Sequence, residues 1–149
     1  MSRGAGAAFG EFIQPSGDHT PYERQYSEQD ALVMRGDVAR ALASYEEIIL
    51  ASPNDPVPRV RAAELYLKNG QRDRAEALYK SVQRMPRVSA SDDVYVSNRL
   101  VDLYLQWPER EVRALTELRR LIETYPDTDI AKRARAGLAN LKSHLGSAE

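Results

Sequence analysis

The chain has 149 residues, and its hydrophobic content of 42% and charged content of 29% suit one soluble domain with a buried core. Its formal net charge of −1 excludes an overall positive field that would gather nucleic acid or an anionic membrane. The absence of cysteine excludes a disulfide framework and thiolate catalysis, and no apolar run approaches the ~20 residues that cross a bilayer.

Residues 1–19 are rich in Gly, Ala and Ser and show neither a helical nor a strand period. They contain no apolar run long enough for a signal peptide. Yet both phenylalanines of the chain, Phe9 and Phe12, lie here beside Ile13. We predict an extended N-terminal arm. Docking of Phe9, Phe12 and Ile13 into a partner, packing onto the chain's own helices, and disorder all remain open.

Residues 20–145 are predicted to be helical, starting from a capping box at Thr20, Pro21 and Glu23. Glycine turns at Gly36 and Gly70 and proline-containing breaks divide this region into seven helices. Their expected bounds are about 21–34, 38–51, 56–69, 72–84, 92–106, 109–124 and 128–145. The second has the strongest one-face helical spacing, in Val38, Ala41, Leu42, Tyr45, Ile48 and Ile49.

The helices repeat at a fixed period. Gly36, Ala41 and Tyr45 return 34 positions later as Gly70, Ala75 and Tyr79. A third unit follows at a slightly longer spacing, with Trp107-Pro108 in place of the turn that contains glycine. The last predicted helix, residues 128–145, has one apolar side that would cover the open end of a stack.

This pattern resembles the tetratricopeptide repeat, a helical hairpin of about 34 residues with small residues at fixed sites and a terminal proline. The matching small residues are Ala41, Ala75 and Ala114, where neighbouring helices would cross closely. The resemblance implies an all-α fold: a right-handed superhelix of three hairpins plus a C-terminal capping helix. The expected organisation is an arm at 1–19, a repeat domain at 20–145 and a tail at 146–149.

The resemblance also implies a concave groove that holds a peptide or a helix of another protein. Carried over by position, the groove residues are Tyr26, Asp30, Val33, Met34, Val60, Glu64, Leu67, Lys68, Tyr95, Asn98, Asp102 and Leu105. Family members that bind a C-terminal carboxylate use Lys and Asn where this chain has Tyr26 and Asp30, so that role is disfavoured. These residues are open to a second interpretation, as solvated or packed side chains.

No residue pattern indicates catalysis, a cofactor or a metal. His19 and His144 lie at opposite ends of the chain, without metal-ligand spacing. Adjacent carboxylates such as Asp92 and Asp93 diverge by about 100° on a helix, so we expect surface and capping charges there. The basic run at Lys132 is expected to be a solvated helix face, so nucleic acid is not a predicted partner.

We predict a non-enzymatic scaffold or adaptor that binds a protein through its groove and its N-terminal arm. The alternative is a peripheral subunit of a larger, membrane-bound complex, anchored by Phe9, Phe12 and Ile13. The expected location is the cytoplasm or the periphery of a membrane complex. The periplasm is an alternative for a chain that has lost a leader.

Overall fold

The computed structural model describes residues 26–147, and in this range it contains seven α-helices and no strand. The prediction of an all-α fold is therefore confirmed. The helices are α2 (Ser27–Met34), α3 (Val38–Ala51), α4 (Pro56–Lys68), α5 (Arg72–Gln83), α6 (Ala90–Leu105), α7 (Glu111–Thr124) and α8 (Asp129–Gly146). The contacts divide the described chain into two units, residues 26–92 and 93–147. The predicted arm residues, Phe9, Phe12 and Ile13, and the predicted capping box at Thr20 lie outside the described residues.

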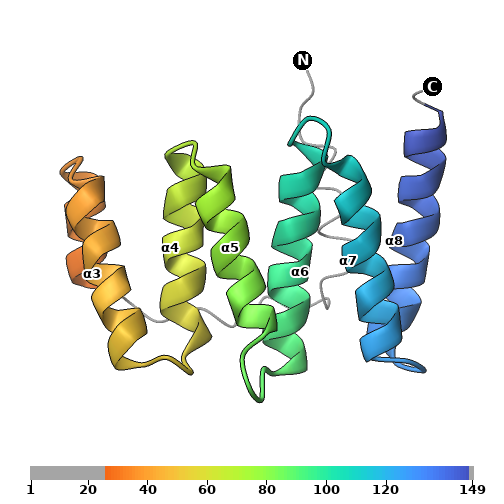
Figure 1. Ribbon diagram of the computed structural model, residues 1–149, viewed down its shortest axis with the longest axis horizontal. Coiled ribbons are helices and arrows are strands. Elements are labelled where there is room, and N and C mark those ends of the chain that lie inside the picture. The colour runs from red at the N-terminus through yellow and green to blue at the C-terminus, as the bar shows by residue number, and fades with distance from the viewer. Residues whose placement is uncertain (1–25, 148–149) are drawn as a thin grey trace. The chain divides into compact units, whose positions relative to one another are not determined.

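Residues 26–92 form two helical hairpins, α2–α3 and α4–α5. Helices α4 and α5 lie side by side and run in opposite directions (Figure 1). The helices exist because apolar residues recur on one face of each and that face can be buried. The buried side chains with the least exposure in this unit, at most 3% each, are Ala41, Tyr45, Val60, Ala62, Ala63, Ala75, Tyr79 and Val82. The core therefore lies along the predicted apolar stripes.

The two glycine turns of this unit need glycine for their backbone conformation. Gly36 has a φ of +81° and Gly70 a φ of +76°, in the left-handed region that side chains with a Cβ rarely adopt. No atom lies within 4 Å of a Cβ built at either position. Glycine is therefore required at both positions because a residue with a Cβ would strain the backbone there, and not because neighbouring atoms would crowd a side chain. This agrees with the predicted glycine turns.

The three small residues of the repeat are all completely buried: Ala41, Ala75 and Ala114 each have 0% exposed surface. This agrees with the prediction that helices pack closely at these positions. A longer side chain has no free volume to enter at a site of this kind, so neighbouring helices would have to move apart.

We expect Ala75→Leu to lower the free energy of unfolding by about 1–3 kcal/mol through overpacking between helices. Urea denaturation followed by circular dichroism measures this change. The exposed Ala77, two residues further along α5, provides the matched control, and Ala77→Leu should leave the midpoint nearly unchanged. An unchanged midpoint for Ala75→Leu would contradict the packing assignment.

Helix α6 begins two residues earlier than the sequence predicted. A helix that starts at Asp92 would have Ser91 as its cap, but the structure caps it with Ser89, whose Oγ accepts a hydrogen bond of 3.0 Å from the Asp92 backbone N–H. The Ser89 hydroxyl also donates to Asp92 Oδ2 at 2.7 Å. Asp92 therefore does have the predicted capping role, with a different serine.

Residues 93–147 form the second unit, in which α7 packs along α8. The α8 residues buried in it are Ala131, Ala134, Gly137 and Leu141, whereas Ile130, Leu138 and Leu145, on the predicted apolar side of this helix, are only half-buried. In the turn between α6 and α7, Glu109 adopts a φ of 70°. A non-glycine residue thus takes the left-handed conformation that Gly36 and Gly70 provide elsewhere. The Arg110 guanidinium stacks 3.9 Å above the ring of Trp107 and covers it.

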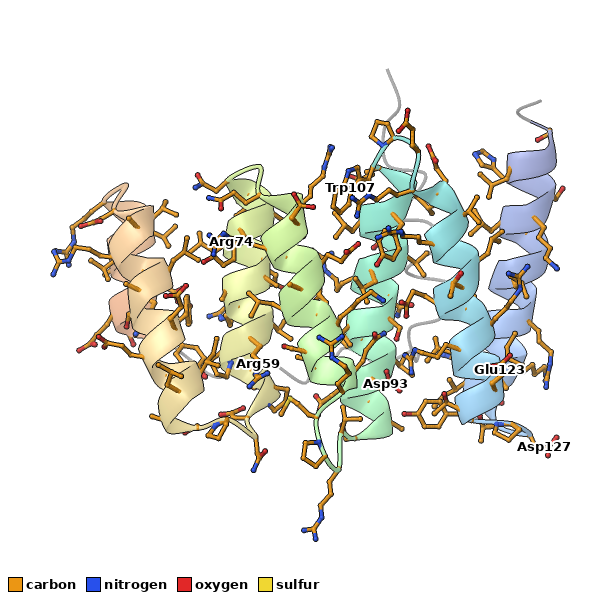
Figure 2. All side chains as sticks on the ribbon, in the orientation of Figure 1. Arg59, Arg74, Asp93, Trp107, Glu123 and Asp127 are labelled. Carbon is orange, nitrogen blue, oxygen red and sulfur yellow. The ribbon has the colours of Figure 1, made fainter. Side chains whose placement is uncertain are left out.

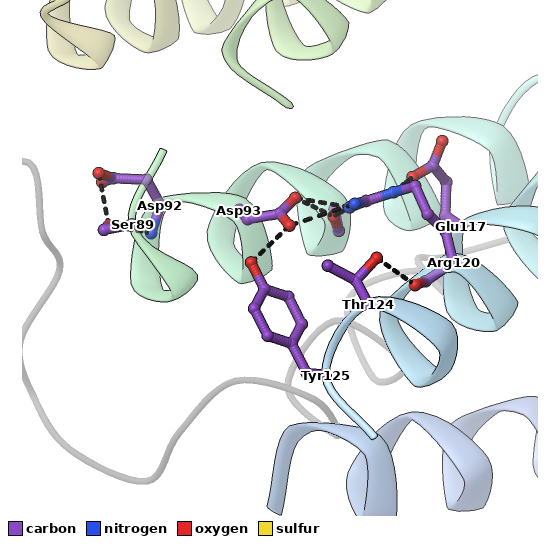
Figure 3. A network of polar contacts seen from close by, with 8 residues as sticks. Ser89, Asp92, Asp93, Glu117, Arg120, Thr124 and Tyr125 are labelled. Carbon is purple, nitrogen blue, oxygen red and sulfur yellow. Dashed lines mark hydrogen bonds and ion pairs between the residues drawn. The ribbon is translucent and has the colours of Figure 1, made fainter. Parts of the chain in front are cut away.

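A buried polar network joins α6, α7 and the turn after α7 (Figure 3). Its centre is Asp93, which is 2% exposed and accepts hydrogen bonds from two nitrogens of the Arg120 guanidinium, at 3.1 and 2.5 Å. The Tyr125 hydroxyl donates to Asp93 Oδ2 at 2.7 Å, and Arg120 also donates to Ser97 Oγ at 2.6 Å. The expectation that Asp93 is a surface or capping charge is therefore wrong. Its carboxylate faces inward because Arg120 and Tyr125 provide partners there.

Arg120 is held between two carboxylates, since its Nε also lies 3.4 Å from Oε2 of Glu117, which is 3% exposed. Burial alone would lower the pKa of Arg120, but the hydrogen bonds and charge of Asp93, assisted by Glu117, raise it. For Tyr125, burial, the hydrogen bond to Asp93 and the charge of Asp93 raise the pKa to about 12. The neutral Tyr125 hydroxyl is therefore the form that the fold prefers.

We expect Tyr125→Phe to lower the free energy of unfolding by about 1–2 kcal/mol at pH 7, through loss of a hydrogen bond to a charged group. The pKa of Tyr125 is raised by folding, so its stabilisation is complete below about pH 10 and disappears as the pH rises through about 12. The difference between wild type and variant should shrink over this window. Urea denaturation at pH 8 to 12 measures it, and a constant difference would contradict this account.

No helix among the described residues is long and apolar enough to cross a membrane. The right-handed superhelix and the domain bounds at residues 19 and 145 remain predictions.

Candidate functional site

A cleft opens on the first unit where α2, α3 and α4 meet. It has a volume of about 70 Å³ and is lined by Asp30, Val33, Tyr45, Arg61, Glu64, Leu65 and Lys68. Helix α2 contributes the first two residues, α3 contributes Tyr45, and the others lie on successive turns of α4. Carboxylates, cations and apolar side chains therefore share one small surface.

Arg61 holds α2 and α4 together across this cleft. Its guanidinium lies 3.6 Å from Asp30 and 5.7 Å from the ring centre of Tyr26. The Tyr26 ring in turn meets the Tyr45 ring edge-on, with 5.5 Å between centroids. Because the Asp30 carboxylate is 56% exposed, the ion pair alone is worth at most about 1 kcal/mol. The contact of Arg61 with the Tyr26 ring, which itself packs on Tyr45, adds to this weak ion pair.

Tyr45 forms the buried side of the cleft, with only 3% of its surface exposed. Burial is the main cause that raises the pKa of Tyr45, and the nearby positive charge of Arg61 acts in the opposite direction. Its hydroxyl therefore stays neutral at physiological pH, and the cleft does not offer a phenolate to a substrate.

Four of the predicted groove residues line the cleft: Asp30, Val33, Glu64 and Lys68. Tyr26 adjoins it through its contacts with Tyr45 and Arg61. Met34 is 89% exposed and Leu67 half-buried, and neither lines the cleft. Val60 has 0% exposed surface, so its side chain is part of the core of this unit.

The remaining predicted groove residues lie on α6, in the second unit. Tyr95, Asp102 and Leu105 are half-buried, and Asn98 is fully buried. Their place in the fold is therefore on one helix, and their common function as a groove remains a prediction.

Sequence reasoning missed Arg61, Tyr45 and Leu65 as cleft residues. Arg61 had a signal, since it recurs 38 residues later as Arg99 in a matching heptapeptide, RAAELYL against RLVDLYL. Tyr45 was predicted only as a core residue, because periodicity shows which face is buried but not that one edge of a ring lines a cleft.

Two further arginines hold α4 to its surroundings at opposite ends (Figure 2). Arg59 donates to Ser81 Oγ and to the Pro53 carbonyl, both at 3.1 Å. Arg74 lies 5.7 Å above the ring centre of Tyr66, whose hydroxyl donates to Glu46 at 3.1 Å. These contacts stabilise the hairpins and lie outside the cleft lining.

The described residues form consecutive helical hairpins, as in a helical repeat protein, and one cleft among them is lined by both charged and apolar side chains. Residues 32–87 match the tetratricopeptide repeat family, which confirms the resemblance for a segment that includes six of the seven cleft residues. A search of curated proteins and a search of solved structures each found no significant match. Tetratricopeptide repeats are typically non-enzymatic and bind other proteins, so this region suggests a protein–protein interaction scaffold.

Among the described residues, the structure brings together no group of three or more His, Asp or Glu side chains that could hold a metal ion.

Proposed function

We propose that the cleft on residues 26–92 binds a short segment of another protein and that this chain acts as a non-enzymatic scaffold. One observation carries the proposal: the apolar side chains of Val33, Tyr45 and Leu65 line a cleft of about 70 Å³ together with charges of both signs. Pockets for small-molecule ligands have volumes of roughly 300–1,000 Å³ and enclose most of the ligand. A cleft of this size instead suits one or two side chains of a peptide or helix.

The charges specify the chemistry of the partner. Asp30 is paired with Arg61, and the half-buried Glu64 and the exposed Lys68 lie one helical turn apart on α4. A partner segment that inserts an apolar side chain against Val33, Tyr45 and Leu65 would place charges of opposite sign beside Glu64 and Lys68. Complementary charges of this kind determine register and specificity more than total affinity.

The test begins with a partner captured from a native extract by the full-length wild-type chain and then purified. We expect the double charge reversal Glu64→Lys/Lys68→Glu to weaken its binding about tenfold or more in calorimetry. The matched control is Glu47→Lys, at an exposed position of α3 outside the cleft lining. Equal affinity of wild type and the double variant would contradict the cleft as the binding site.

The anchored-subunit alternative predicts a different outcome. If the arm holds the partner, Phe9→Ser/Phe12→Ser in the full chain should release the partner while the charge reversal in the cleft leaves it bound.

A further inference from the structure

The Tyr45 hydroxyl, in the cleft of the first unit, has no hydrogen-bond partner among the described residues. The side chain as a whole is only 3% exposed. Two other tyrosines differ in this respect, since the hydroxyls of Tyr66 and Tyr125 each donate to a carboxylate, at 3.1 and 2.7 Å. Because a largely buried hydroxyl normally has a partner, the Tyr45 hydroxyl is a donor that a bound segment can use.

The hydroxyl end of Tyr45 lies near the charged residues of the cleft. After burial, which has the largest effect on the pKa of Tyr45, three charges of the lining act on it: those of Arg61, Asp30 and Glu64. Charges shift a pKa in this way when they lie within several ångströms of the group. A ligand that reaches the hydroxyl therefore enters the charged part of the cleft.

A second group of the cleft has no partner, and it is also a donor. Lys68 is exposed, and its ammonium makes no ion pair or hydrogen bond with any residue in the range 26–147. Arg61 pairs with Asp30 through a terminal nitrogen, but its buried Nε has no acceptor in that range either. A ligand that complements these groups supplies acceptor oxygens that carry negative charge.

The size of the cleft fits the acidic end of one side chain. Its volume of about 70 Å³ is well above the roughly 10–15 Å³ that one water needs, and well below the roughly 300 Å³ of small-molecule pockets. A carboxylate has two acceptor oxygens, so one can face the Tyr45 hydroxyl while the other faces Lys68. Val33 and Leu65, on the same lining, provide apolar contacts for a neighbouring side chain.

We propose that the segment bound by this cleft has an internal glutamate or aspartate whose carboxylate accepts a hydrogen bond from the Tyr45 hydroxyl and pairs with Lys68. This inference rests on the proposed function and adds the chemical class of the partner. A large apolar residue beside the acid packs against Val33 and Leu65. Tyr45 then selects an acidic side chain over an apolar one of similar size, because the apolar one would leave the hydroxyl without an acceptor in the closed interface.

The test selects binders from random short peptides displayed on phage, with the full-length wild-type chain as bait. The peptides are fused through their C-terminal ends, so every acidic group that they offer is an internal side chain. We expect the wild type to enrich Glu or Asp beside a large apolar residue, and Tyr45→Phe to lose this preference. No acidic preference with the wild type, or an equal preference with Tyr45→Phe, would overturn the proposal.

Calorimetry with an enriched peptide isolates the hydroxyl. Tyr45→Phe should weaken binding about tenfold, as expected for a lost hydrogen bond to a charged group. It should not change the affinity of a peptide with leucine in place of the acid. Equal weakening of both peptides would indicate a general change of the cleft and would overturn the proposal.

Tyr66→Phe is the matched control, because Tyr66 lies outside the cleft lining and donates to Glu46. It should lower the midpoint of urea denaturation and leave the peptide affinity unchanged. Tyr45→Phe should do the reverse, since its hydroxyl has no partner among the described residues to lose. A lower affinity with Tyr66→Phe, equal to that with Tyr45→Phe, would overturn the assignment of the hydroxyl.

Lys68→Met tests the charge at an exposed position, without altering the core. It should weaken the acidic peptide severalfold and leave a peptide with glutamine in place of glutamate unaffected, whereas equal effects on both would overturn the pairing. If Glu64→Lys/Lys68→Glu releases the captured partner but Tyr45→Phe and Lys68→Met do not, the cleft remains the binding site and only this inference fails. If none of the three weakens binding, the proposed function fails as well.

Discussion

Asp93→Ala is expected to lower the free energy of unfolding by about 3–5 kcal/mol, the largest effect that we expect of any substitution in the second unit. The Asp93 carboxylate is the common acceptor for Arg120 and Tyr125, and its side chain is only 3% exposed. Its removal leaves the half-buried guanidinium of Arg120, whose side chain is 31% exposed, without its main counter-charge. Urea denaturation at pH 7 measures the loss.

Two controls separate the buried charge from general effects of substitution. Glu123→Ala removes an exposed carboxylate from α7 and should change the free energy of unfolding by less than about 0.5 kcal/mol. Arg120→Met combined with Asp93→Leu removes both charges, so the double variant should be more stable than the sum of the two single losses predicts. Additive single losses would show that Asp93 and Arg120 do not act as a pair.

Tyr79→Ala is expected to have the largest effect in the first unit, a loss of about 3–5 kcal/mol. Tyr79 lies on α5, has 0% exposed surface and is one of the two largest fully buried side chains of the described chain. Its truncation removes a ring from the core and leaves a cavity that rigid helices can close only in part. Chemical denaturation measures the total, and amide hydrogen exchange should show the loss of protection in α3, α4 and α5.

Tyr79→Phe is the matched variant, because it keeps the ring and removes only the hydroxyl. It should cost much less than the alanine variant. If the two variants are equally destabilised, the ring volume is not the source of the stability of Tyr79.

The sequence by itself determined the helices and most of their ends. The spacing of apolar residues predicted α3, α4 and α5 to within one residue, since an amphipathic period and a turn are local properties of the chain. Gly36 and Gly70 marked left-handed turns, and the recurrence of Ala41 at Ala75 marked close packing. The match of residues 32–87 to the tetratricopeptide repeat agrees with this part of the prediction.

The sequence-based prediction was wrong or silent where the residue type fits more than one local environment. Asp93 stands in the first turn of a helix, where a carboxylate usually faces solvent and favours the positive end of the dipole. Its burial depends on Arg120 and Tyr125, which lie 27 and 32 residues further along the chain. Likewise, Glu109 occupies a turn position that requires a positive φ, although nothing in its residue type predicts one.

Only the tertiary structure decided which groove residues meet. Asp30 and Arg61 come from different helices, and the cleft exists because α2, α3 and α4 pack so that Arg61 reaches Tyr26. Asn98 and Val60 are completely buried although their helix positions predicted a partner-facing surface. Periodicity specifies the direction in which a side chain leaves its helix, whereas the neighbour that it meets depends on contacts between segments far apart in the chain.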